Sequence, residues 1–289
     1  MPQATANGIS IEYDTFGDKS CPALLLITGG GSQMIHWENG FCDSLAQKGY
    51  YVIRFDNRDA GLSQKFEEMG IPDIAAAMKG TPVPPPYTIE DMADDSVGLL
   101  DALKIDKAHI CGASMGGMIA QAVSYRHPER VRSLISIMSS TGNPELPKIK
   151  QELFNEVYKP VPDQREEYVT HYVQLWRKIW SPGFPFEEDR VANLVRESFD
   201  RSYYPQGMVR QSMAVMTHGF PKAPIASIKA PTLVIHGDKD PFMPVEGGRE
   251  TAHLIRDAEL FVIEGMGHDM PKDTWLVITN AMVEHMQKA

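Results

Sequence analysis

The chain has 289 residues, of which 43% are hydrophobic and 23% charged, and this balance is typical of a globular protein with a sizeable core. Its net charge of -10 opposes binding to nucleic acid or to anionic lipid. The three cysteines, Cys21, Cys42 and Cys111, are too few and too scattered for a disulfide framework or a zinc site. The N-terminus lacks the pattern of a signal peptide, and no apolar run is long enough to span a bilayer. We therefore expect a cytoplasmic protein with no membrane insertion.

Short apolar runs alternate with longer helical patterns along the chain. Residues 8–16 alternate apolar and polar side chains, which predicts an edge strand. Near-continuous apolar runs follow and predict buried parallel strands at residues 23–27, 51–55, 108–111, 134–138, 232–235 and 260–263. A capping-box pattern that starts at Thr88 predicts a helix between two of them. This alternation predicts an α/β fold, with a mostly parallel sheet of about eight strands and helices on both faces.

Two segments depart from this rhythm. Residues 142–219 contain no buried-strand run, are rich in aromatic residues and are bracketed by prolines, so we expect a helical insertion there; further core helices are the alternative. We accordingly divide the chain into a first core part (1–141), a helical cap (142–222) and a second core part (223–289). Residues 65–87 include the run Pro82-Val83-Pro84-Pro85-Pro86 and predict a surface excursion.

The chain contains one G-x-S-x-G pattern, Gly112-Ala113-Ser114-Met115-Gly116. It follows a predicted strand and precedes a helical pattern at residues 118–125, as a nucleophile elbow requires. A sharp turn there would lift the Ser114 hydroxyl above the sheet edge, and the two glycines would avoid clashes.

A serine hydroxyl needs a base to take its proton, and the base needs an orienting carboxylate. His268 lies just past the predicted strand at residues 260–263, and Asp240 lies just past the one at residues 232–235. Both therefore belong at the sheet edge that carries Ser114. We predict His268 as the base and Asp240 as the acid, with Asp238 as the competing acid.

The negative charge that develops on a substrate oxygen in the transition state is stabilised by backbone N–H donors. We expect one from Met115 and a second from the loop Thr28-Gly29-Gly30-Gly31-Ser32, with Gly30 as the donor. A phosphate-binding loop is the rival interpretation, but the lysine and spacing of a Walker A motif are missing.

With these residues the chain resembles the α/β-hydrolase fold family over essentially its whole length. The resemblance implies catalytic roles for Ser114, Asp240 and His268, an oxyanion hole at Gly30 and Met115, and a cap between the sixth and seventh strands. One departure is Thr28-Gly29, where many members carry His-Gly. This departure, together with the stretch Arg54 to Ser63, is similar to small bacterial esterases of the aclacinomycin methylesterase type.

The expected function is hydrolysis of small to medium carboxylic esters through an acyl-enzyme, with no cofactor and no metal. The same triad could instead serve lactone or carbon–carbon bond hydrolysis, perhydrolysis or cyanohydrin cleavage, and a non-catalytic binding protein is a third alternative. Aromatic and methionine side chains in the cap predict an ester substrate with an apolar part, bound by Trp176, Met208 and Met213. The sequence leaves open whether the chain forms a homo-oligomer.

Overall fold

The computed structural model describes residues 2–289. Its centre is an eight-stranded sheet with the order β1-β2-β4-β3-β5-β6-β7-β8. The β1–β2 and β2–β4 pairs are antiparallel, and the other pairs are parallel. The prediction of a mostly parallel sheet of about eight strands is therefore confirmed. The strands are β1 (Gln3–Ala6), β2 (Ile9–Phe16), β3 (Ala23–Ile27), β4 (Tyr51–Phe55), β5 (Ala108–Ala113), β6 (Val131–Ile137), β7 (Thr232–Gly237) and β8 (Glu259–Ile263).

Both edges of the sheet differ from the expectation. The predicted edge strand is β2, but β1 folds back on it and takes the edge. The turn between them, Asn7-Gly8, has φ values of 48° and 79°, which a two-residue hairpin turn requires. At the other edge, β8 was expected to be buried on both faces, yet Leu260 is 37% exposed because β8 has only β7 beside it.

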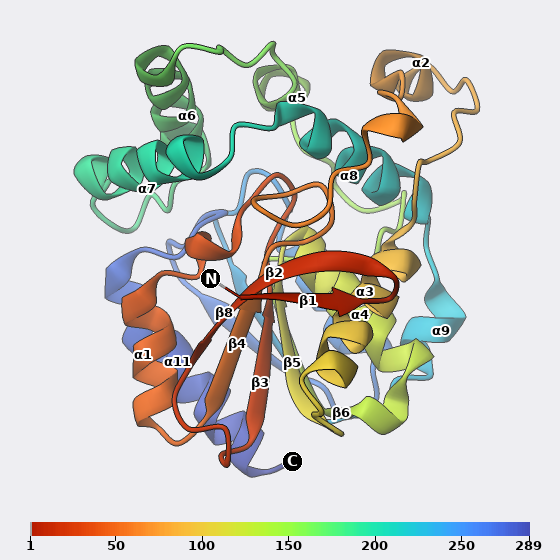
Figure 1. Cartoon of the computed structure of the whole chain (residues 1–289), viewed down its shortest axis with the longest axis vertical. Helices are drawn as coiled ribbons and strands as arrows, with labels where there is room; N and C mark the ends of the chain where they lie inside the picture. The colour runs from red at the N-terminus through yellow and green to blue at the C-terminus, as the bar shows by residue number, and fades with distance from the viewer. Residues whose placement is uncertain (1) are drawn as a thin grey trace.

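Side chains of the central strands alternate between two hydrophobic cores. Leu25 and Ile27 pack with α3 (Ile89–Ala102) and α4 (Met115–Arg126). Leu24 and Leu26 point the other way and pack with α1 (Asn39–Gln47) and α11 (Lys272–Gln287). Figure 1 shows these two helix layers on opposite faces of the sheet, as predicted. α10 (Glu246–Leu254) packs on β7, and the short helices η1 (Met34–His36) and η3 (Pro128–Arg130) lie in connections.

The expected helix start at Thr88 is confirmed in detail. The Thr88 hydroxyl accepts a hydrogen bond from the Asp91 N–H at 3.1 Å, and the Asp91 carboxylate accepts one from the Thr88 N–H at 2.8 Å. These two bonds satisfy backbone donors that the first turn of α3 leaves free.

The described residues between β6 and β7 form helices and no strand. Figure 1 shows α5 to α8 gathered over one end of the sheet. Within this group α6 and α7 pack together around Val169, Val173, Trp180 and Val191. The fifth helix, α9, packs instead against α4 and α10 in the core. The helices are α5 (Gln151–Val157), α6 (Arg165–Ile179), α7 (Glu188–Arg201), α8 (Pro205–His218) and α9 (Lys222–Ala226).

The excursion at residues 65–87 lies on the outer side of α8. It contains η2 (Glu67–Met69) and α2 (Ile74–Met78), with buried side chains at its two ends, Phe66 and Tyr87. The Arg210 guanidinium of α8 donates to the Gly70 carbonyl at 2.9 Å.

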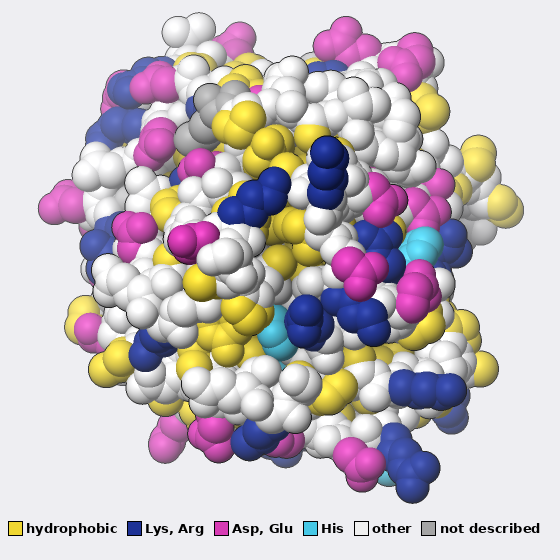
Figure 2. Space-filling model, turned by 60° about the horizontal axis from the view of Figure 1, so that its bottom comes forward, with side chains coloured by type: hydrophobic (Ala, Val, Ile, Leu, Met, Phe, Trp, Pro, Cys, Tyr) yellow, Lys and Arg dark blue, Asp and Glu magenta, His cyan; other side chains and the backbone are white. Residues whose placement is uncertain are grey.

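On the face seen in Figure 2, acidic and basic side chains are interspersed with apolar ones. No helix among residues 2–289 combines the length and the apolar character that crossing a membrane requires.

Candidate active site

Ser114 occupies a sharp turn between β5 and α4. Its φ of 56° and ψ of -124° are rare for a residue with a side chain. The turn tolerates no side chain at its two glycines, because a Cβ on Gly112 would lie 1.9 Å from the Gly116 carbonyl oxygen and one on Gly116 would lie 2.2 Å from the Ile27 carbonyl oxygen. The G-x-S-x-G pattern is therefore a steric requirement of this turn, which presents the Ser114 hydroxyl at the N-terminus of α4.

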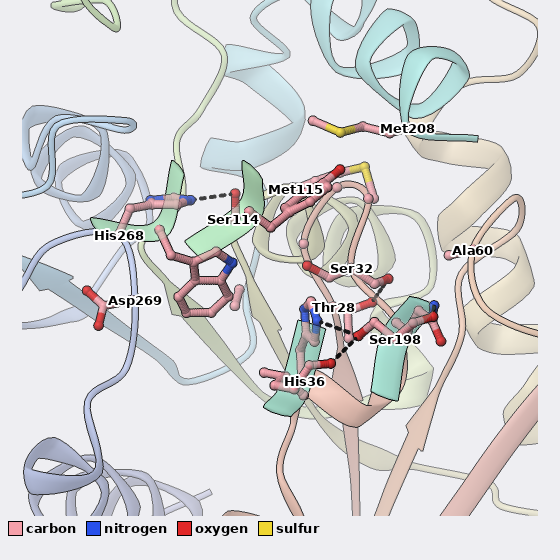
Figure 3. A pocket seen from close by; sticks show the side chains of 18 of the residues that line it. Thr28, Ser32, His36, Ala60, Ser114, Met115, Ser198, Met208, His268 and Asp269 are labelled. Carbon is pink, nitrogen blue, oxygen red and sulfur yellow. Dashed lines mark hydrogen bonds between the residues drawn. The ribbon is translucent and has the colours of Figure 1, made fainter. Parts of the chain in front are cut away.

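His268 and Asp240 meet Ser114 at this edge of the sheet. The Nε2 atom of His268 lies 3.0 Å from Ser114 Oγ, and its Nδ1 atom lies 2.7 Å from Asp240 Oδ2. Figure 3 shows the His268 ring pointing at the Ser114 hydroxyl. The structure thus brings together three residues that are up to 154 positions apart in the chain.

Both oxygens of the Asp240 carboxylate lie within hydrogen-bond distance of donors in the protein. The N–H groups of Phe242 and Met243 each donate to Asp240 Oδ1 at 2.8 Å. Burial alone would raise the pKa of Asp240, but the charge of His268 and hydrogen bonds from His236 and His268 outweigh it and lower the pKa to about 2. An ionised Asp240 keeps the proton of His268 on Nδ1, which leaves Nε2 free to accept the Ser114 proton.

The competing acid, Asp238, has a different role. Its carboxylate accepts a hydrogen bond from the Gly265 N–H at 2.6 Å and pairs with Lys239 at 3.0 Å. Asp238 therefore ties the ends of β7 and β8 together, and Asp240 is the residue that contacts His268.

The glycine loop after β3 lies beside Ser114. A Cβ on Gly29 would lie 3.2 Å from the Ser114 Cβ, and one on Gly30 would lie 3.7 Å from the Met115 sulfur. Among the hydrogen bonds of residues 2–289, the backbone N–H groups of Gly30 and Met115 have no protein acceptor. These are the two donors predicted for the oxyanion, and both border the space above Ser114.

The loop is anchored to its surroundings at both ends. The Asn57 side chain donates to the Thr28 carbonyl at 3.1 Å, and the Gly31 N–H donates to Gln211 of α8 at 2.8 Å. Gln211 in turn donates to the Arg58 carbonyl at 2.7 Å. Bonds on either side of Gly30 therefore fix the path of its backbone.

Ser114 and His268 open into a cavity of about 290 Å³ between the sheet edge and helices α5 to α8. Most of its surface is apolar, as an apolar substrate part requires. Trp176 and Met208 line it, as predicted. The described residues of the excursion at 65–87 do not border it.

The prediction for Met213 is wrong. Its side chain is fully buried and lies toward the excursion at residues 65–87, where it borders a second cavity with Pro82 and Val83. Met208 and Met213 are five residues apart on α8, and five helical steps of about 100° turn a side chain roughly 140° away. Met208 therefore faces Ser114, whereas Met213 faces the opposite side.

Sequence reasoning missed several residues that line the cavity. Asp269 follows His268 directly, so its position next to the base was the one available signal. The others come from elements where no local pattern marks a cavity wall. They include Trp37 after η1, Phe41 on α1, Arg190 on α7, Phe242 after β7 and Trp275 on α11.

The helices over the cavity are joined to the core by buried ion pairs. Arg210 of α8 contacts Asp59 at 2.8 Å, and Arg201 of α7 contacts Asp56 at 2.7 Å. Both aspartates are fully buried.

Within residues 2–289, no group of three His, Cys, Asp or Glu side chains is arranged to hold a metal ion.

Comparison with known proteins places this geometry in a family. The model of the alpha/beta hydrolase fold matches residues 22–273, so the chain belongs to the α/β-hydrolase fold family. It is 27% identical to rhodomycin D methylesterase DauP of Streptomyces sp. (strain C5), over 99% of this chain and 97% of that protein. This relative confirms the similarity to esterases of the aclacinomycin methylesterase type.

Two further similarities cover most of the chain. It is 30% identical to 2-hydroxymuconate semialdehyde hydrolase of Pseudomonas sp. (strain CF600), over 85% of this chain and 80% of that protein. The solved structure of the enol-lactonase from Burkholderia xenovorans LB400 superposes with a TM-score of 0.77 at 23% identity, over 99% of this chain and 100% of that one. The last comparison supports the fold alone.

Proposed function

We propose that this protein is a serine hydrolase that cleaves carboxylic esters through an acyl-enzyme intermediate. The observation that carries the proposal is the unbroken path from Ser114 Oγ to His268 Nε2 at 3.0 Å and from His268 Nδ1 to Asp240 Oδ2 at 2.7 Å. The name of its relative DauP, a methylesterase, supports ester hydrolysis independently of that geometry.

Each residue has one task in the first half of the reaction. Ser114 Oγ attacks the ester carbonyl carbon while its proton passes to His268 Nε2. The carbonyl oxygen becomes an oxyanion, and the N–H groups of Gly30 and Met115 donate to it. Asp240 stabilises the imidazolium of His268. As the tetrahedral intermediate collapses, the C–O bond to the alcohol breaks, and His268 returns its proton to the departing oxygen.

Water completes the cycle. It loses a proton to His268 Nε2 and attacks the acyl carbon bound to Ser114 Oγ. Collapse of the second tetrahedral intermediate breaks the bond to Ser114, which regains its proton from His268 and leaves a carboxylic acid. Neither half-reaction changes an oxidation state, so the residues named are sufficient for the chemistry.

The substrate is a small molecule with an apolar part. The cavity above Ser114 is walled by aromatic and methionine side chains such as Trp37, Trp176, Met208 and Phe242. We further propose that residues 142–222 act as a cap on a core of residues 1–141 and 223–289. A cytoplasmic location stays a prediction.

A second candidate reaction uses the same triad. The names of two relatives, an enol-lactonase and a semialdehyde hydrolase, favour lactone or carbon–carbon bond hydrolysis as the alternative. In both reactions Ser114 or an activated water attacks a carbonyl carbon, so the triad alone does not discriminate between them. A comparison of kcat/KM for simple esters, lactones and dienone acids does so directly.

The test is a ladder of p-nitrophenyl esters from acetate to palmitate, measured for the native chain and for Ser114→Ala. We expect turnover that peaks at short or medium acyl chains and is lost in the variant. Absence of turnover, with Ser114 still labelled by a phosphonate, would overturn ester hydrolysis while leaving the triad reactive. Absence of both would support a non-catalytic protein.

A further inference from the structure

The loop that carries His268 runs alongside the segment that leaves α6. The His268 N–H donates to the carbonyl of Ile179, the last residue of α6, at 2.9 Å. Further along the same segment, the Gly183 N–H donates to the Gly265 carbonyl at 2.9 Å. The base of the triad is thus bonded through its backbone to the helical insertion, in addition to the bonds of its side chain within the triad.

Ser181 lies between these two bonds and bridges the residues on either side of His268. Its hydroxyl accepts a hydrogen bond from the Gly267 N–H at 2.7 Å and donates its own hydrogen to Asp269 Oδ1 at 2.6 Å. Ser181 is fully buried and Asp269 is 4% exposed, so bulk water does not compete for these bonds. Figure 3 shows Asp269 beside His268. A single hydroxyl therefore fixes both the residue before the base and the residue after it.

The two segments pack with no room for side chains between their backbones. A Cβ on Gly267 would lie 2.6 Å from the Ile179 carbonyl oxygen, and one on Gly183 would lie 2.7 Å from the Gly265 Cα. The glycines thus permit an approach that any other residue would prevent. Residues 179–183 and the loop of His268 form one close-packed unit, so a displacement of the first would displace the second.

Backbone hydrogen bonds from the core reach this loop before His268. Asp238 accepts a hydrogen bond from the Gly265 N–H at 2.6 Å, and the Lys239 N–H donates to the Met266 carbonyl at 3.0 Å. At His268 the core contributes the bonds of the ring to its two triad partners. The hydrogen bond that holds the His268 N–H comes from the insertion.

Ser181 itself is not part of the cavity wall. Ile179 and Asp269 line the cavity, as does Trp176 of α6, whereas the Ser181 side chain is enclosed behind them. Ser181 therefore has no contact with a substrate in the cavity. Any effect of Ser181 on the reaction passes through the residues that it holds.

We propose that Ser181 is a positioning residue for His268, through which the helical insertion holds the base of the triad against Ser114. The positioning role rests on the proposed function for the reaction that it serves. Proton transfer needs the two heavy atoms within about 2.6–3.2 Å of each other, and a misplacement of about 1 Å costs roughly a hundredfold in rate. The insertion thus completes the catalytic machinery as well as covering the cavity.

Ser181→Ala removes the bridge and leaves the cavity wall unchanged. We expect kcat for the preferred p-nitrophenyl ester to fall by about ten- to a hundredfold and KM to stay within about twofold of the native value. The rate at which a p-nitrophenyl phosphonate labels Ser114 falls by the same factor, since this single step also needs His268 as the base. Ser133→Ala is the matched control, because Ser133 is fully buried on β6 and its hydroxyl lies 2.8 Å from His109 Nδ1. It loses stability but keeps both rates.

The proton on His268 Nδ1 gives a signature that a purely structural role of Ser181 would not move. It lies in a hydrogen bond of 2.7 Å to Asp240, so its NMR signal is expected far downfield. We expect one sharp signal from the native chain and none from His268→Gln. The signal broadens and moves upfield in Ser181→Ala, because the ring is no longer held against Asp240, and is unchanged in Ser133→Ala.

Asp269 provides a second test that leaves Ser181 in place. Asp269→Asn keeps an oxygen that accepts the Ser181 hydrogen, whereas Asp269→Leu has a similar shape and no acceptor. Both variants remove the same charge near His268, so a difference between them reports the hydrogen bond. At pH 8, above the pKa of about 7 to which burial raises the native Asp269, we expect phosphonate labelling to be about tenfold slower in Asp269→Leu than in Asp269→Asn.

The positioning role is overturned if Ser181→Ala keeps the native rates and the native signal, or if Ser133→Ala slows labelling as much. It is also overturned if Asp269→Leu and Asp269→Asn are labelled equally fast, and this pair decides if Ser181→Ala does not fold. A native chain that is labelled by the phosphonate but hydrolyses no ester refutes only ester hydrolysis, and slower labelling of Ser181→Ala then still supports the positioning of His268. Native ester turnover in Ser181→Ala refutes only the positioning role.

Discussion

Asp59 and Arg210 form an ion pair, 2.8 Å long, in which both side chains are buried although the residues are 151 positions apart. Asp59 lies in the loop after β4, and Arg210 lies on α8. The Tyr87 hydroxyl also donates to Asp59 at 2.8 Å. The pair therefore joins the core, the excursion at residues 65–87 and the helix that carries Met208 over the cavity.

Arg210→Met tests how far this pair stabilises the fold. Removing one partner leaves Asp59 buried without its cation, which costs about 3–5 kcal/mol and lowers Tm by roughly 10 °C in a chain of this size. Arg165→Met is the matched control, because Arg165 pairs with Asp200 at an exposed position, where solvent and salt screen the pair and its loss changes Tm little. Equal Tm values for the two variants would contradict the structural role of the buried pair.

Met208 and Met213 lie on opposite sides of α8. Met208→Ala enlarges the cavity beside Gly31, so we expect the kcat/KM ratio of long to short p-nitrophenyl esters to rise by about tenfold. Met213→Ala leaves the ratio unchanged and lowers the free energy of unfolding by about 2–5 kcal/mol, because its side chain is fully buried outside the cavity. The two residues would be misassigned if Met213→Ala changed the ester preference and Met208→Ala did not.

Asp269 should make stability fall as pH rises. Burial raises its pKa to about 7 in the folded chain, so folding favours the protonated carboxyl. Its contribution to stability is fully present below the unfolded pKa of about 3.9 and is lost as pH rises through about 7. Asp269→Asn removes this loss, so the Tm difference between the variant and the native chain becomes more positive from pH 5 to pH 8.

Asp273→Asn, at an exposed position on α11, is the control, and we expect its Tm difference from the native chain not to change with pH in this range. A Tm difference for Asp269→Asn that stays constant between pH 5 and pH 8 would mean that Asp269 ionises as readily in the folded chain as in the unfolded one. The contribution of Asp240 to stability changes with pH in the opposite direction, because its pKa is lowered to about 2 in the folded chain. Its contribution is present above about pH 4 and is lost as pH falls towards 2.

The sheet and the triad were predictable because their signals are local. β3 is apolar on both faces and β4 is so except at Arg54, and the predicted runs 23–27 and 51–55 match the structure at both ends. Ser114, Asp240 and His268 each follow a strand, and chain order alone assigns them to one sheet edge. Asp240 was separable from Asp238 only by contacts, since both follow β7 within three residues.

The cavity wall was not predictable in the same way. The residues opposite Ser114 come from α5 to α8, whose orientation depends on distant contacts such as those of Arg201 with Asp56 and Arg210 with Asp59. Met213 shows the consequence, because composition marks it as apolar but cannot say which side of α8 faces the site. β1 was missed because its four residues, which precede the Asn7-Gly8 turn, give too short a pattern.

Trapping the acyl-enzyme tests the role of Ser114 as nucleophile most directly. The native chain is mixed with p-nitrophenyl acetate, quenched in acid during the burst of p-nitrophenol, digested and mapped by mass spectrometry. We expect one acetyl group on the peptide that contains Ser114, and neither burst nor acetyl group in Ser114→Ala. Steady turnover by Ser114→Ala, or an acetyl group on another residue that turns over at the steady-state rate, would contradict this role.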